Sequence, residues 1–163
     1  MDANEFDAFY RASFNKLVGQ IYAMCGNLAE AQEAVQEAFI RAWDHRRKLD
    51  KDLGPEAWVR TTAYRLAVSN WRKSSRARRQ PDRALESRGS VEPGPDRILI
   101  DEALAKLPEQ QRRVIILHHL CDMSVEDVAA EIGAPSGTVK ARLARGREQL
   151  ARLLHSEKEF RHA

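Results

Sequence analysis

Basic and small side chains alternate between residues 136 and 147, and this mixture suits non-covalent chemistry on DNA. Arginine and lysine reach guanine edges or phosphates, whereas small side chains let a helix approach the floor of the major groove. A bidentate arginine–guanine contact contributes roughly 1–3 kcal/mol of base discrimination. The side chains that the helical period turns outward are Thr138, Lys140, Ala141, Arg142, Ala144 and Arg145.

The residues around this segment predict the helix-turn-helix that would hold it. Ser124 and Ser136 are suitable N-caps for two consecutive helices. Ala129 is small where the two helices must cross, and Gly133 stands where the turn between them needs a left-handed residue. The residues expected to pack inward from the second helix are Val139 and Leu143. A plain helical hairpin with a solvated basic face is the alternative.

The helical segment 28–47 carries an acidic face opposite its apolar stripe, with one isoleucine in its middle. An apolar anchor ringed by charge is typical of a protein-docking patch. A lone isoleucine on a solvated surface is also common, so both interpretations stay open here. The residues of this face are Glu33, Gln36, Glu37, Ile40 and Asp44.

The helical segment that begins at Pro55 interleaves aromatic and basic side chains. This pattern suits stacking on unpaired bases beside a track of phosphate contacts. Tyr64 and Trp71 share one face with Ala57 and Val68 and are expected to belong to the core instead. The surface candidates are Trp58, Arg60, Arg65, Arg72 and Lys73.

Helical periodicity dominates the chain, and no period-2 alternation predicts a strand, so the expected fold class is all-α. Residues 76–95 are rich in Arg, Ser, Gly and Pro and are predicted to be a flexible linker. It would join two small helical domains, 1–75 and 96–155, and a frayed tail would follow at 156–163. The predicted helices are 4–24, 28–47, 55–74, 96–106, 109–120, 124–131 and 136–154.

Charge is distributed unevenly along the chain. Residues 1–40 carry 2 basic and 6 acidic side chains, whereas residues 41–80 carry 12 basic and 4 acidic ones. Such asymmetry indicates two partners of different chemistry, with nucleic acid facing the basic block. The chain shows neither a secretory signal nor a membrane-spanning segment, which predicts a cytoplasmic protein without membrane partners.

Enzymatic and metal-dependent functions find no support in the motifs. No triad order, glycine-rich phosphate loop or paired catalytic acids are visible, so we predict neither an enzyme nor a cofactor. His118, His119 and Cys121 are close in sequence, but adjacent residues on a helix point about 100° apart and rarely share one ion. We therefore predict no metal site.

Four segments together resemble the extracytoplasmic-function (ECF) sigma factors of bacterial RNA polymerase. Residues 30–43 and 57–73 match region 2 of that family, and residues 107–114 and 137–147 match region 4, in the same order. The resemblance implies a region 2 helical bundle and a region 4 helix-turn-helix. It also implies that the chain binds core RNA polymerase and directs promoter recognition and DNA melting.

The resemblance also implies roles for individual residues. The clamp helices of the polymerase largest subunit would be bound by Glu33, Gln36, Glu37, Ile40, Arg41 and Asp44. The −10 element would be bound by Trp58, Arg60, Arg65, Asn70, Arg72 and Lys73, with the loop 45–53 capturing a flipped base. The −35 element would be bound by Thr138, Lys140, Ala141, Arg142, Ala144, Arg145 and Arg147. Further implied partners are the polymerase flap, promoter DNA and an anti-sigma factor.

Two other functions remain as alternatives to a sigma factor. A stand-alone helix-turn-helix regulator would use the C-terminal domain but leave the acidic face without a role. A sigma-like decoy that engages an anti-sigma factor would be expected to lose the basic DNA-reading residues, which are present here.

Overall fold

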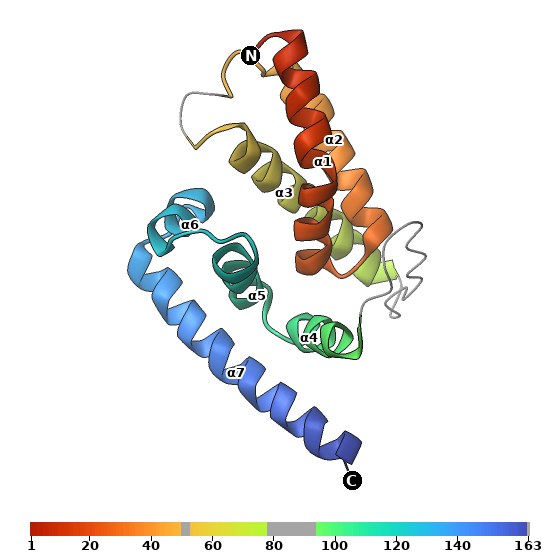
Figure 1. The fold of residues 1–163 in the computed structure, drawn as a ribbon, viewed down its shortest axis with the longest axis vertical. Helices are drawn as coiled ribbons and strands as arrows, with labels where there is room; N and C mark the ends of the chain where they lie inside the picture. The colour runs from red at the N-terminus through yellow and green to blue at the C-terminus, as the bar shows by residue number, and fades with distance from the viewer. Residues whose placement is uncertain (50–52, 78–93, 163) are drawn as a thin grey trace. The chain divides into compact units, whose positions relative to one another are not determined.

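The computed structural model describes residues 1–49, 53–77 and 94–162, and in them it contains seven α-helices, one π-helical turn and no strand (Figure 1). The predicted all-α class is confirmed. The chain divides into two compact units, residues 1–86 and 87–163. Most of the predicted linker lies outside the described residues. None of the described helices combines the length and apolar character that crossing a bilayer requires.

The N-terminal unit is a bundle of three helices. They are α1 (Ala3–Cys25), α2 (Leu28–Asp44) and α3 (Pro55–Ala77). Gly26 ends α1 in the left-handed conformation, at φ 78°. The side chain of Asn27 then caps α2 by accepting the N–H of Glu30 at 3.0 Å. Because only these two residues separate the helices, α1 and α2 form a tight hairpin.

The core of the N-terminal unit draws on all three helices. Leu17 and Ile21 of α1, Val35 of α2 and Val59 of α3 are fully buried. A layer of aromatic rings extends this core between α1 and α2, and Phe39 contacts several of them. These contacts fix the rotation of α2, so that its acidic face points away from the bundle.

The C-terminal unit holds the remaining helices. They are α4 (Pro95–Ala105), α5 (Glu109–Ile115), the π-helical turn η1 (Ile116–Leu120), α6 (Val125–Ile132) and α7 (Ser136–His162). The sequence predicted one helix over 109–120, but the N–H of Cys121 donates to the carbonyl of Ile116 at 2.9 Å, a step of five residues. That wider turn ends the helix as a π-helix, a feature often found at functional sites.

The predicted helix-turn-helix is present. The hydroxyl of Ser124 accepts the N–H of Asp127 at 3.1 Å and caps α6. Gly133 ends α6 with φ 69°, the left-handed conformation expected of it. Val139 and Leu143 are buried, as predicted. Ser136 was predicted to be the N-cap of α7, but α7 already begins at Ser136, so this prediction is wrong by one position.

Helix ends differ from the expected ones elsewhere. α7 continues to His162, so the tail predicted to fray from 156 is helical over its described part. No proline or glycine interrupts residues 147–162, and Lys106 forms an ion pair with Glu157 at 3.0 Å that joins α4 to α7. In the N-terminal unit, α2 ends at Asp44 rather than at 47, and α3 continues to Ala77.

Gly146 permits the close crossing of α5 and α7. A Cβ added there would overlap the Cδ1 of buried Ile115 and lie 3.2 Å from its Cγ1. Overpacking costs about 1–3 kcal/mol, and the better helix propensity of alanine returns at most about 1 kcal/mol. We therefore expect Gly146→Ala to destabilise the C-terminal unit by up to about 2 kcal/mol.

Thermal unfolding can assign this loss to one unit. All three tryptophans and all three tyrosines precede residue 72, so near-ultraviolet signals report the N-terminal unit, whereas far-ultraviolet circular dichroism reports both. Gly146→Ala should lower only the transition that lacks an aromatic signal. Gly137→Ala, where nothing lies within 4 Å of the added Cβ, is the matched control and should change little. Equal effects of the two substitutions would contradict the packing argument.

Candidate functional site

The N-terminal half of α7 exposes the predicted DNA-reading residues. Its opposite side is buried against α5 and α6 through Val139, Leu143 and Gly146. Thr138 and Arg142 are half-buried at the margins of the exposed face. The exposed members are Lys140, Ala141, Ala144, Arg145 and Arg147.

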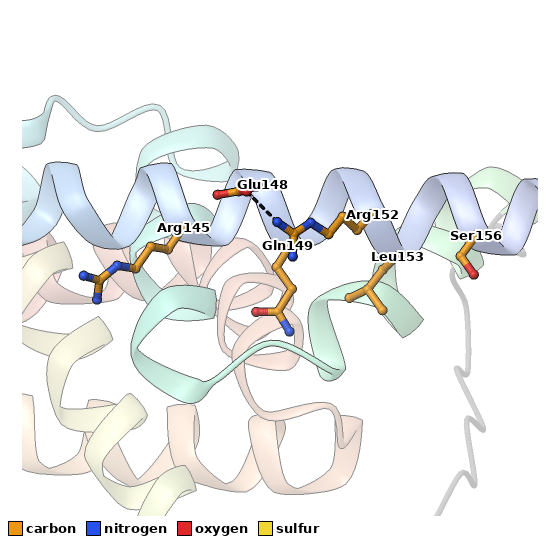
Figure 2. Close-up of a pocket in the computed structure, with 6 residues that line it drawn as sticks. All are labelled: Arg145, Glu148, Gln149, Arg152, Leu153 and Ser156. Atoms are coloured by element: carbon orange, nitrogen blue, oxygen red, sulfur yellow. Dashed lines mark hydrogen bonds and ion pairs between the residues drawn. The ribbon is translucent and has the colours of Figure 1, made fainter.

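Figure 2 follows this helix beyond the predicted reading face. Arg145 extends its guanidinium away from the helix axis, and one turn further Glu148 and Arg152 form an ion pair of 2.6 Å. The two arginines lie on the same side of α7, seven residues apart. The surroundings of the two arginines differ. Arg152 is paired with Glu148 of the same helix, whereas Arg145 lies in the part of α7 that belongs to the helix-turn-helix.

Arg147 is held by a histidine of another element. Its Nε lies 3.0 Å from the Nε2 of His119 in η1. A guanidinium can only donate, so the Nε2 of His119 must be the acceptor and the ring must be neutral with its proton on Nδ1. Burial, followed by the charges of Arg147 and His118, lowers the pKa of His119 from its ordinary 6.5.

This lowered pKa predicts a pH dependence of stability. Well above pH 6.5 the His119 ring is neutral in both the folded and the unfolded chain and contributes no slope. As the pH falls below 6.5, the unfolded chain binds the proton first, so stability is lost between 6.5 and the lowered pKa of the folded state. His119→Gln keeps an acceptor but cannot titrate, so its thermal midpoint should fall less between pH 7.5 and pH 5.5.

The comparison of the two chains isolates His119, because every other titrating group is common to both. Far-ultraviolet circular dichroism at four or five pH values is sufficient. Parallel pH profiles of the native chain and His119→Gln would contradict the neutral, hydrogen-bonded histidine.

The acidic face of α2 is exposed as the sequence predicted. Ile40 leaves 56% of its surface open, more than a core position would. Arg41 donates to Glu37 at 3.1 Å, while Glu33 and Asp44 face solvent. Burial and, second, the charge of Glu33 raise the pKa of Glu30 on the first turn of α2. The face thus joins an apolar centre to a ring of negative charge.

A shallow hollow of about 270 Å³ connects this face to α3. It brings together predicted polymerase-binding residues of α2 and Asn70, which was predicted to contact DNA. Leu66 also lines it and was missed, although its spacing of four residues from Asn70 puts both on one side of α3. The lining residues are Glu33, Ala34, Gln36, Glu37, Ile40, Leu66 and Asn70.

The expectation that Arg60 lies on the surface is wrong. Its side chain is only 6% exposed, and its Nη1 donates to the Oε1 of Gln20 on α1 at 3.1 Å. A buried charge requires such partners, so Arg60 joins α3 to α1 and is not presented to a ligand. The pairing spans 40 positions of sequence and has no local signature.

The remaining members of the α3 set are placed differently. Arg65 and Asn70 are exposed, and Trp58 is half-buried with its ring 5.7 Å from that of His45. The side chains of Trp71, Arg72 and Lys73 lie outside the described residues, so their predicted roles stay predictions.

Trp43 and Arg46 form a surface stack that the sequence analysis missed. The guanidinium lies 4.1 Å from the centre of the indole, and its Nη1 donates to the carbonyl of Trp43 at 2.8 Å. The indole is 38% exposed and packs edge-on against Phe6 at 5.1 Å. Trp43 and Arg46 are three residues apart at the end of α2, and this spacing was the sequence signal that could have predicted the stack.

Two protein-family models match the chain. The one described as Sigma-70 region 2 matches residues 9–77, and the one described as Sigma-70, region 4 matches residues 97–150. Each match falls within one of the two compact units.

Curated relatives carry corresponding names. The ECF RNA polymerase sigma factor SigW of Bacillus subtilis is 29% identical over 161 residues, covering 86% of this chain and 83% of the relative. SigL of Mycobacterium tuberculosis is 32% identical over 128 residues, covering 74% and 72%. EcfG of Rhodopseudomonas palustris is 33% identical over 137 residues, covering 82% and 76%.

Solved structures agree with these matches. The sigma factor RpoE, in complex with the anti-sigma factor NepR from Bartonella quintana, has a TM-score of 0.77 at 25% identity, covering 94% of this chain and 98% of that one. CnrH, in complex with the cytosolic domain of CnrY, has a TM-score of 0.72 at 20% identity, covering 95% and 90%, and supports the fold alone. Region 2, region 4 and their order therefore identify the chain as a member of the ECF sigma factor family.

Proposed function

We propose that this chain binds core RNA polymerase and directs it to promoters by contacting the −10 element with region 2 and the −35 element with region 4. A single observation carries the proposal: one chain exposes both an acidic face centred on Ile40 and a basic helix-turn-helix face centred on Arg145. A stand-alone regulator would need only the second of these faces.

The acidic face of α2 is the proposed polymerase-docking surface, and its counterpart would be the clamp helices of the largest subunit. Ile40 supplies an apolar anchor, and the hollow beside it can accept a side chain of the partner. The surrounding acidic residues select a basic partner and favour the right orientation. The proposed contacts are Glu33, Gln36, Glu37, Ile40, Arg41 and Asp44.

Helix α3 is the proposed contact with the −10 element. Exposed Arg65 and Asn70 and half-buried Trp58 support this role, and Arg72 and Lys73 are proposed with them from sequence alone. Arg60 is left out because it is buried. Melting needs capture of extruded bases, whose unstacking costs a few kcal/mol, and stacking against an aromatic ring offsets about 1–3 kcal/mol per base.

The exposed face of α7 is the proposed contact with the −35 element. Lys140 and Arg145 can reach base edges, and Ala141 and Ala144 keep the helix close to the groove. Thr138, Arg142 and Arg147 are proposed as phosphate contacts. The two DNA sites reinforce each other through effective concentration once polymerase holds them at a fixed spacing.

The same proposal implies a cellular location and a regulator for the chain. The chain would act in the cytoplasm without catalytic chemistry or a cofactor of its own. A sigma factor with an anti-sigma factor is among the solved structures similar to this chain, and we propose an anti-sigma factor as its regulator.

In-vitro transcription tests the proposed function. Core polymerase with and without the full chain is supplied with a library of genomic promoter fragments, and the transcripts are sequenced. Discrete transcripts that depend on the chain are expected, and their start sites define the −10 and −35 sequences. Tight site-specific DNA binding without polymerase would favour the stand-alone regulator, and copurification with polymerase without transcripts would favour the decoy.

A further inference from the structure

His119 lies outside the helix-turn-helix, yet its side chain reaches the helix that would read DNA. It belongs to η1, which precedes α6, and its Nε2 accepts the Nε–H of Arg147 at 3.0 Å across 28 positions of sequence. The bond is exposed at the surface of the C-terminal unit. It is therefore a contact between a supporting element and the candidate DNA-binding helix.

His119 is itself held by its neighbour. The Nδ1–H of His118 donates to the carbonyl of Met123 at 2.7 Å, which fixes the first ring. The ring of His119 packs edge-on against it, with centroids 4.8 Å apart and planes at 74°. Because η1 is a π-helical turn that closes on the carbonyl of Ile116, the backbone beneath both rings is also fixed.

Arg147 stands on the predicted DNA-facing stripe of α7. Lys140, Ala144 and Arg147 are spaced by four and three residues, so they project from one side of the helix, and all three are exposed. A guanidinium has five N–H donors, and the bond to His119 uses the one on Nε. The donors on its two terminal nitrogens suit a phosphate, which arginine binds through paired N–H groups.

We propose that His119 is a positioning residue for promoter binding: it holds Arg147 in the orientation that presents its terminal nitrogens to a DNA phosphate. The inference rests on the proposed function, because it requires that α7 contacts DNA. An exposed arginine samples many rotamers, and a contact made from a fixed orientation loses less conformational freedom on binding. His119 supplies that fixed orientation before DNA arrives.

The test compares holoenzymes that contain Arg147→Ala, His119→Leu or both substitutions in the full chain. The probe is a fluorescein-labelled duplex with the −35 element of a promoter recovered by transcription. One phosphate contact fewer should weaken binding about fivefold at about 0.15 M salt and reduce the salt slope by about one. We expect about fivefold for Arg147→Ala, about two- to fivefold for His119→Leu, and no further loss in the double variant.

A conservative variant of His119 distinguishes a positioning role from an effect on the stability of the C-terminal unit. His119→Gln keeps an acceptor at the reach of Nε2 and should bind DNA within twofold of the native chain. His155→Leu is the matched control, because this histidine is also exposed and pairs along its own helix α7, with Glu159 at 3.1 Å. A second readout needs no DNA: the Nε–H of Arg147 should exchange slowly in nitrogen-15 NMR spectra and exchange faster in His119→Leu.

The outcomes distinguish this inference from the proposed function. If Arg147→Ala weakens DNA binding and His119→Leu does not, or if their effects multiply, the positioning role is overturned while the function stands. Unchanged Nε–H exchange in His119→Leu overturns it as well. If Arg147→Ala binds like the native chain, the phosphate assignment fails, and the inference fails with it.

Discussion

Ile40→Glu should prevent this chain from copurifying with core RNA polymerase. Ile40 is 56% exposed at the centre of an acidic face, so in the proposed complex it is the apolar anchor. Burying a carboxylate there removes the anchor and adds an unpaired charge, and such central positions account for 2 kcal/mol or more, roughly 30-fold in affinity. The measurement is co-elution of the full chain with core polymerase in size-exclusion chromatography, supported by a titration.

Ala12→Glu is the matched control for this prediction. Ala12 is exposed on α1 in the same unit, so the substitution adds the same charge to the same bundle but away from the acidic face. It should retain polymerase binding, and both variants should keep the helical content and thermal midpoint of the native chain. Copurification of Ile40→Glu at native levels would overturn the docking surface.

The helix-turn-helix was predictable because its determinants are local. A capping serine, a left-handed glycine and two inward aliphatic residues act within about 20 positions, and Ser124, Gly133, Val139 and Leu143 all take their expected roles. The exposed face of α2 was predictable for the same reason: helical period alone determines which side chains oppose the buried stripe.

Several features that sequence analysis missed depend on contacts between distant residues. Arg60 and its exposed neighbour Arg65 are both arginines of α3 and cannot be told apart in the sequence. Only the proximity of Gln20 on α1 makes Arg60 a buried residue. The pairing of His119 with Arg147 likewise depends on the proximity of η1 to α7. The length of α7 was underestimated because Glu157 gains a partner, Lys106, that is 51 positions away.

Arg145→Ala should weaken use of the −35 element while leaving polymerase binding unchanged. Arg145 is exposed on α7, and its guanidinium extends away from the helix axis (Figure 2). If it makes the proposed contact with a guanine, its loss removes roughly 1–3 kcal/mol of base discrimination, about five- to 150-fold in the preference for the matched element over a scrambled one. Transcription from promoters that differ only in the −35 element measures this preference directly.

Arg152→Ala provides the control, because the two arginines share one side of α7 but Arg152 lies seven residues further along and is paired with Glu148 at 2.6 Å. A straight helix that enters the major groove contacts bases mainly with its N-terminal turns, so the more distant arginine should contribute nothing to the preference. Similar effects of both substitutions would mean that α7 attracts DNA only through its general charge. Loss of polymerase binding in Arg145→Ala would instead mean that this face binds protein, and the assignment of α7 to the −35 element would be wrong.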